Sequence, residues 1–145
     1  MRPLMLVLSL ALCSTFLLAA TVKEPATGTE FPDTVTIGDA KAACTGVDLR
    51  TKFLMKIYAV AHYGDPAAWP KDAAPAARLQ YWRNADVLKV FVLKFTYAVS
   101  AEKIRNAWNE GLENAQYKGA NREALLAIFK EDLKVGDQLR FIAQP

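Results

Sequence analysis

Arg50, Tyr58 and His62 are the side chains of this sequence best suited to chemistry, and all three lie in one strand-like stretch, residues 46–63. Read with the two-residue period of a strand, they share a face with two lysines. The opposite parity is apolar and comprises Phe53, Met55, Ile57, Ala59 and Ala61. A cationic and phenolic face backed by an apolar one suits a ligand with a negative head group. The alternative is a half-exposed strand whose lysines are simply solvated.

The surrounding sequence predicts the strands that position these residues. Alternating or continuous apolar runs bounded by turn residues indicate a strand. Such runs occupy residues 31–37, 49–63, 88–97 and 137–143. Between the second and third of them, residues 67–77 are rich in Ala and Pro, which favours a loop with a short helix held down by Trp69.

Two helices are predicted before the last strand. Ser100 can cap the first by accepting from the backbone N–H of Lys103, and Asn121 can cap the second. The first helix carries one apolar stripe at helical spacing, expected to be buried, made of Ile104, Ala107, Trp108, Gly111, Leu112 and Ala115. Strands grouped on either side of paired helices predict an α+β fold, an antiparallel sheet with helices packed on one face.

The N-terminus has the pattern of a secretory leader. Arg2 precedes an apolar run over residues 4–18, and small residues at 19–20 are followed by a polar segment from Thr21. The apolar run falls short of the ~20 residues that span a bilayer. The sequence therefore predicts a signal peptide at residues 1–20, one domain at residues 21–145, and a periplasmic or secreted protein without a stable membrane anchor.

Composition argues against two classes of partner. The chain has 18 basic and 15 acidic side chains, a formal net charge of +3, which is too balanced to favour nucleic acid. Cys44 is the one cysteine left after removal of the leader, so no intrachain disulfide is expected. Together with a single histidine it has no ligand spacing typical of zinc, and no metal site is predicted.

Several segments, in consistent order, resemble the bacterial chalcone isomerase-like family. They lie at residues 31–35, 46–50, 50–59, 99–103, 107–111 and 134–137. The resemblance covers about residues 30–143 and implies an open-faced β-sandwich, in agreement with the α+β pattern. Because the family normally continues with a glycine-rich hairpin and a further helix, we expect a C-terminally truncated or short member. Such a chain would have an exposed sheet edge open to self-association.

The resemblance also bears on catalysis. Plant enzymes with this fold bind the chalcone phenolate through an arginine that follows a Gly-x-Gly turn, and a threonine, a tyrosine and an asparagine complete the site. Those four positions fall on Arg50, Tyr58, Ser100 and Ala107, and Asp48 replaces the second glycine. Cyclisation of a chalcone also requires polar groups that stabilise the negative charge developing on the enolate, and an arginine that binds the phenolate does not supply them. No catalytic residue is therefore predicted, and an intramolecular lyase of the isomerase type is the alternative.

Fatty-acid-binding relatives of this fold hold a carboxylate with an arginine and a tyrosine, positions that correspond to Arg50 and Tyr58. The resemblance thus implies an exported binding protein for a small, apolar, anionic ligand. Eight residues of straight strand span roughly 26 Å, so the chain must turn between Arg50 and Phe53 for both side chains to reach one carboxylate. Without that turn, Tyr63 is the substitute anchor. Asp48 is a candidate modulator, since pairing with Arg50 would neutralise the guanidinium.

Two further alternatives remain open. His62 faces the same side as Tyr58, which would suit an axial haem ligand in an apolar pocket, although the chain has no Cys-x-x-Cys-His attachment sequence. Apart from haem, no cofactor is predicted. The second alternative is a protein-interaction module that uses the exposed sheet edge.

Overall fold

The computed structural model describes residues 20–84 and 86–145 of the chain. The predicted signal peptide, apart from its last residue, lies outside the described residues. In the described part, no helix has both the length and the apolar character needed to cross a membrane.

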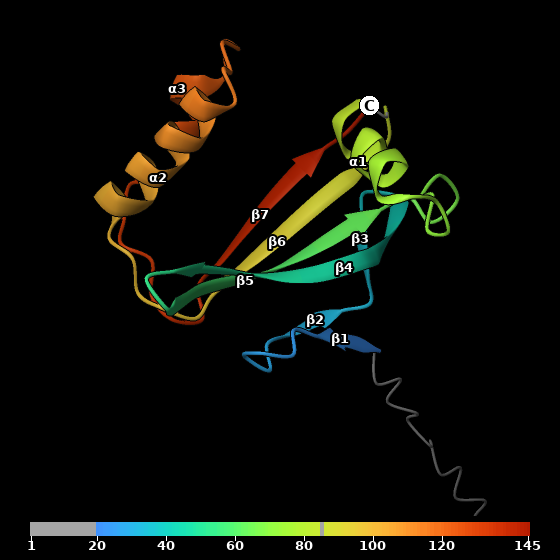
Figure 1. The fold of residues 1–145 in the computed structure, drawn as a ribbon, viewed down its shortest axis with the longest axis horizontal. Helices are drawn as coiled ribbons and strands as arrows, with labels where there is room; N and C mark the ends of the chain where they lie inside the picture. The colour runs from blue at the N-terminus through green and yellow to red at the C-terminus, as the bar shows by residue number, and fades with distance from the viewer. Residues whose placement is uncertain (1–19, 85) are drawn as a thin grey trace, which may run out of the picture.

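A five-stranded antiparallel sheet of order β3-β4-β5-β6-β7 forms the centre of the fold (Figure 1). Its strands are β3 (Thr34–Ile37), β4 (Ala40–Lys52), β5 (Met55–Gly64), β6 (Lys89–Phe95) and β7 (Gln138–Ala143). A separate two-stranded ribbon pairs β1 (Thr21–Lys23) with β2 (Glu30–Pro32). Neighbouring strands in sequence are neighbours in the sheet, so each strand is positioned by a direct antiparallel partner.

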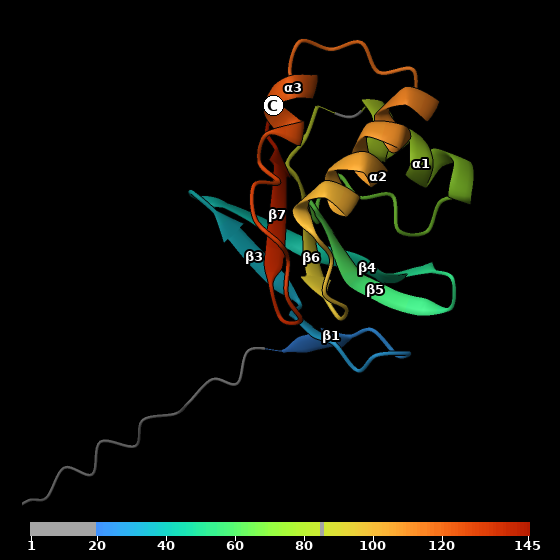
Figure 2. The same cartoon turned by 90° about the vertical axis from the view of Figure 1, so that its left-hand side faces the viewer.

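The sheet is apolar on both faces, and each face has its own cover (Figure 2). The β1–β2 ribbon covers one face, where Phe31, Tyr63 and Val90 are fully buried. The helices cover the other, where Phe95 packs with Ile104 of α2 and other residues. The α+β prediction with helices on one face is confirmed.

The predicted strand at residues 49–63 is in fact the two arms of a hairpin. Phe53 and Leu54 form its turn, with φ of 50° and 67°. The pairing of β4 with β5 continues up to this turn, where Lys52 lies opposite Met55. The prediction that this apolar face is buried is therefore wrong at the turn, where the Phe53 side chain is 83% exposed. Ala59 and Ala61, farther along β5, are buried as predicted.

The described residues form three helices: α1 (Pro75–Asn84), α2 (Ala101–Asn114) and α3 (Arg122–Leu126). The helix predicted near residues 67–77 begins later than expected, but Trp69 does hold it, with ring centroids 5.1 Å from Tyr81. Ser100 caps α2, since its hydroxyl accepts from the Lys103 N–H at 3.3 Å. Asn121 precedes α3 with helical dihedrals and makes no side-chain cap, so that part of the prediction was wrong.

Candidate functional site

Arg50 and Tyr58 are direct cross-strand partners in the β4–β5 hairpin. Opposite residues in an antiparallel pair point to the same face with their Cβ atoms about 4.5–5.5 Å apart. The turn at Phe53 and Leu54 comes slightly later than the position we required, and a register shift after Arg50 accommodates the difference. The geometric requirement for a two-point contact from these side chains is met.

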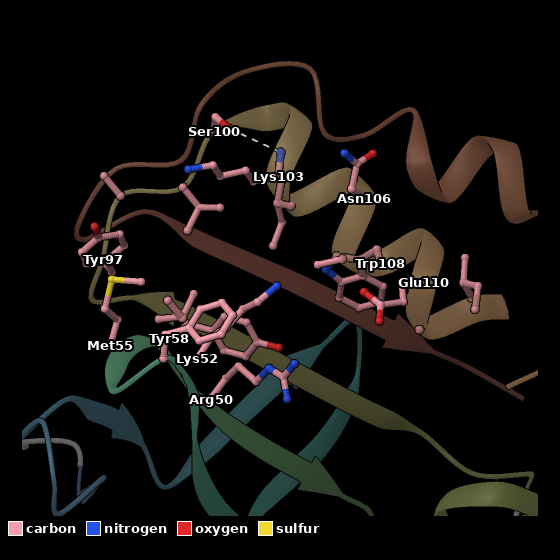
Figure 3. Close-up of a pocket in the computed structure, with 18 residues that line it drawn as sticks. Arg50, Lys52, Met55, Tyr58, Tyr97, Ser100, Lys103, Asn106, Trp108 and Glu110 are labelled. Atoms are coloured by element: carbon pink, nitrogen blue, oxygen red, sulfur yellow. Dashed lines mark hydrogen bonds between the residues drawn. The ribbon is translucent and has the colours of Figure 1, made fainter. Parts of the chain in front are cut away.

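Both side chains enter a cavity of about 830 Å³ between the hairpin, the loop after β6 and helix α2 (Figure 3). Pockets for small ligands commonly measure about 300–1,000 Å³. Arg50, Lys52 and Tyr58 line the cavity from the hairpin, and Trp108 projects from α2 towards the sheet. The charged lining residues are Arg50, Lys52, Lys103 and Glu110. Three cations against one carboxylate give the cavity a positive balance.

Apolar residues form the walls, and the α2 stripe supplies one of them. We expected this stripe to be buried, but only Ile104 is, whereas Ala107 and Gly111 are exposed and line the cavity. The small side chains at these two positions leave space where larger ones would close the gap between α2 and the sheet. Trp108 is fixed in the wall by stacking on Phe141 of β7, with ring centroids 4.9 Å apart.

The protonation of Tyr58 and the charge of Arg50 suit the binding of an anion. Burial raises the pKa of Tyr58 above its usual value, against the opposing effect of Arg50, so the phenol is a protonated donor at neutral pH. Within the described chain Arg50 forms no ion pair, and Asp48, two residues earlier on the same face, does not neutralise it. The Tyr58 ring contacts Phe95 at 5.4 Å between centroids, which fixes its position.

The structure does not bring His62 or Tyr63 to the cavity. His62 packs between Phe91 and Trp82, with ring centroids at 5.3 Å and 5.9 Å. Burial lowers the pKa of His62, and Asp48 opposes that shift. Tyr63 lies on the opposite face of the sheet, fully buried, where its hydroxyl donates to the Pro32 carbonyl at 2.9 Å.

Our sequence reasoning missed the polar side chains that α2 contributes to the lining. Lys103, Asn106 and Glu110 recur at spacings of three and four and thus share one helical face. The signal was present in the sequence, but the apolar stripe beside it was assigned to a packed core. Once Ala107 and Gly111 are seen to line a cavity, the neighbouring polar positions become part of the site.

A family comparison decides where this fold belongs. The model of a family described as chalcone isomerase-like matches residues 23–145. The chain belongs to the chalcone isomerase-like family. A solved structure of a fatty-acid binding protein from Arabidopsis thaliana is similar with a TM-score of 0.66 and 23% identity, covering 87% of this chain and 74% of that one. A comparison with curated proteins finds no significant match.

In this chalcone isomerase-like chain, the structure also shows the surroundings of Ser100 and Ala107, two of the positions that the sequence resemblance implied for a catalytic site. The Ser100 hydroxyl is engaged as the α2 cap, and Ala107 offers no polar atom to the cavity. Tyr58 therefore supplies the one hydroxyl at those positions that is free of hydrogen bonds to the described chain. The Arg50 guanidinium and the Tyr58 hydroxyl can therefore hold and orient an anion in this cavity.

Proposed function

We propose that the protein is a non-catalytic binding protein for a small, apolar, anionic ligand of the fatty-acid type. The observation that carries the proposal is the unpaired guanidinium of Arg50 opposite the protonated phenol of Tyr58 within an apolar cavity. A carboxylate can accept from both groups, and the alkyl chain lies along the wall formed by Ile57, Ile104 and Trp108. That a protein of similar fold is described as fatty-acid binding supports the proposal.

The charge pattern also defines which end of the ligand goes where. Arg50 and Lys52 stand on the hairpin side, whereas α2 contributes both Lys103 and Glu110. The two hairpin cations act together, while the opposite charges from α2 offset each other, so the head group sits against the hairpin.

A titration with a long-chain fatty acid and the matched fatty alcohol tests this function. We expect the wild type to bind the acid more tightly than the alcohol, and Arg50→Ala to remove that preference. Arg140→Ala is the matched control, because this exposed arginine lies opposite Val92, on the sheet face covered by the ribbon. Equal affinity for acid and alcohol in the wild type would refute the carboxylate anchor.

We also propose that residues 1–20 are a cleaved leader and that the mature protein, residues 21–145, acts in the periplasm or outside the cell. The short apolar run ending before Thr21 supports this proposal. N-terminal sequencing of protein purified from its own cells tests it. A protein that retains Met1 and sediments with membranes would contradict it.

A further inference from the structure

The turn between β4 and β5 lies at one end of the sheet (Figure 1), and large apolar residues are exposed there. This end holds five of the nine large hydrophobic residues that are exposed in the described chain, namely Phe53, Leu54, Met55, Tyr97 and Val135. Backbone hydrogen bonds place their segments together: the Tyr97 N–H donates to Ile57 at 3.2 Å, and the Gly136 N–H donates to Phe95 at 2.8 Å. Leu54 is 100% exposed. Apolar residues clustered in this way mark an interaction surface.

The turn itself is built from residues that local folding does not favour. Phe53 and Leu54 both have positive φ, 50° and 67°, in a two-residue hairpin turn. Turns of this kind favour Asn-Gly, because bulky L-residues are strained in the left-handed region. Since neither side chain packs into the core, burial within this chain does not offset that strain. Exposed bulky residues in a strained turn point to a contact outside the chain.

Charge distinguishes the kind of surface that the turn fits. Lys52 and Lys56 flank the apolar pair and are exposed, and residues 49–64 contain no acidic side chain. Lys56 donates to the Ala26 carbonyl at 2.6 Å, so Lys52 is the lysine that is available for a head group. Apolar residues bracketed by lysines suit an anionic lipid surface, where the former enter the acyl boundary and the latter meet the head groups. Two copies of the chain meeting turn to turn would instead bring their lysines together.

We propose that the hairpin tip, residues 52–56, docks reversibly on an anionic lipid bilayer. The tip is continuous with the cavity, because Lys52, Phe53 and Met55 also line it. Docking thus places the mouth of the cavity against the bilayer, from which an apolar ligand can enter without crossing water. Docking would complement the proposed binding of a fatty acid. Because bilayer binding is measured without fatty acid, the docking proposal and the ligand-binding proposal are tested independently of each other.

Vesicle co-sedimentation of the mature protein tests the docking. The vesicles contain either phosphatidylcholine alone or phosphatidylcholine with phosphatidylglycerol. We expect the wild type to bind the anionic vesicles. The affinity of the Phe53→Asn/Leu54→Gly variant for these vesicles should be lower by a factor of roughly ten or more. The same variant should melt at an equal or higher temperature, because Asn-Gly relieves the strained turn. A loss of binding with a retained fold separates docking from a structural role.

Two further variants sharpen the test. Lys52→Gln should weaken binding to anionic vesicles about fivefold and leave binding to neutral vesicles unchanged, whereas Lys56→Gln should have a smaller effect, because Lys56 already donates to the Ala26 carbonyl at 2.6 Å. Leu79→Ser is the matched control, since Leu79 is an exposed apolar residue of α1, away from the tip, and its loss should have no effect. Equal vesicle binding by the wild type and the Asn-Gly variant would overturn the proposal. The proposal would also be overturned if the wild type did not bind vesicles, or if it formed dimers that depend on the hairpin tip in sedimentation experiments.

Discussion

Replacing Tyr58 with phenylalanine removes one hydroxyl from the cavity and little else. The ring and its 5.4 Å contact with Phe95 remain, and the hydroxyl makes no hydrogen bond within the described chain that would be lost. Its donation to a ligand carboxylate contributes about 0.5–1.5 kcal/mol, or roughly twofold to tenfold in affinity. Arg50→Ala removes a charged donor and should cost about 1.5–3 kcal/mol. Because Arg50 is exposed in the free protein, we expect the lower part of that range.

Calorimetric titration of a long-chain fatty acid into the wild type, both single variants and the double variant measures these losses. If both groups grip one carboxylate, the double variant should lose less than the sum of the single losses, because each group depends on the placement that the other provides. Tyr117→Phe, an exposed tyrosine outside the cavity lining, is the control and should change nothing. Strictly additive losses, or an equal loss on the fatty alcohol, would show that Arg50 and Tyr58 do not share a carboxylate.

Three other predictions follow from the structure. Chalcone should cyclise no faster with the protein than in buffer, because Ala107 and the capped Ser100 leave enolate charge unsupported; a rate enhancement that disappears in Arg50→Ala would reverse this conclusion. Burial raises the pKa of Tyr63 from 10.0 to about 12, so its contribution to stability is complete below pH 10 and is lost as the pH rises through 12. Tyr63→Phe should cost about 1–3 kcal/mol at neutral pH, through the unpaired Pro32 carbonyl, and should flatten the alkaline decline in urea-unfolding free energy. Ser100→Ala should lower the free energy of unfolding by about 1 kcal/mol through loss of the α2 cap, whereas Ser100→Asp should retain it, as thermal melts would show.

The sequence was most informative where one residue type makes a local and obligatory interaction. Ser100 caps α2 as predicted, and β6 was visible as a nearly continuous apolar run because both sheet faces bury its residues. The turn at Phe53 and Leu54 escaped the pattern because it lacks the Asn-Gly signal that marks such turns. Its existence followed only from the requirement that Arg50 and Tyr58 meet.

The site was predicted in part for a similar physical reason. Period-two alternation identified the face that holds Arg50 and Tyr58, and the family resemblance supplied their pairing. Alternation cannot distinguish a packed helix stripe from the wall of a cavity, since both are apolar at the same spacing. Ala107 and Gly111 were therefore assigned to the core, and the polar residues beside them were overlooked.

The separation of the two sheet faces has a consequence for how this domain can evolve. Tyr63, Phe31 and Val90 form a sealed core beneath the ribbon, fastened by Lys94, which donates to the Glu30 carbonyl at 2.6 Å. None of these residues lines the cavity. Substitutions in α2 or the hairpin can therefore change the shape of the cavity while this core continues to secure folding. Sequence change around the cavity is thus uncoupled from the part of the sheet that holds the domain together.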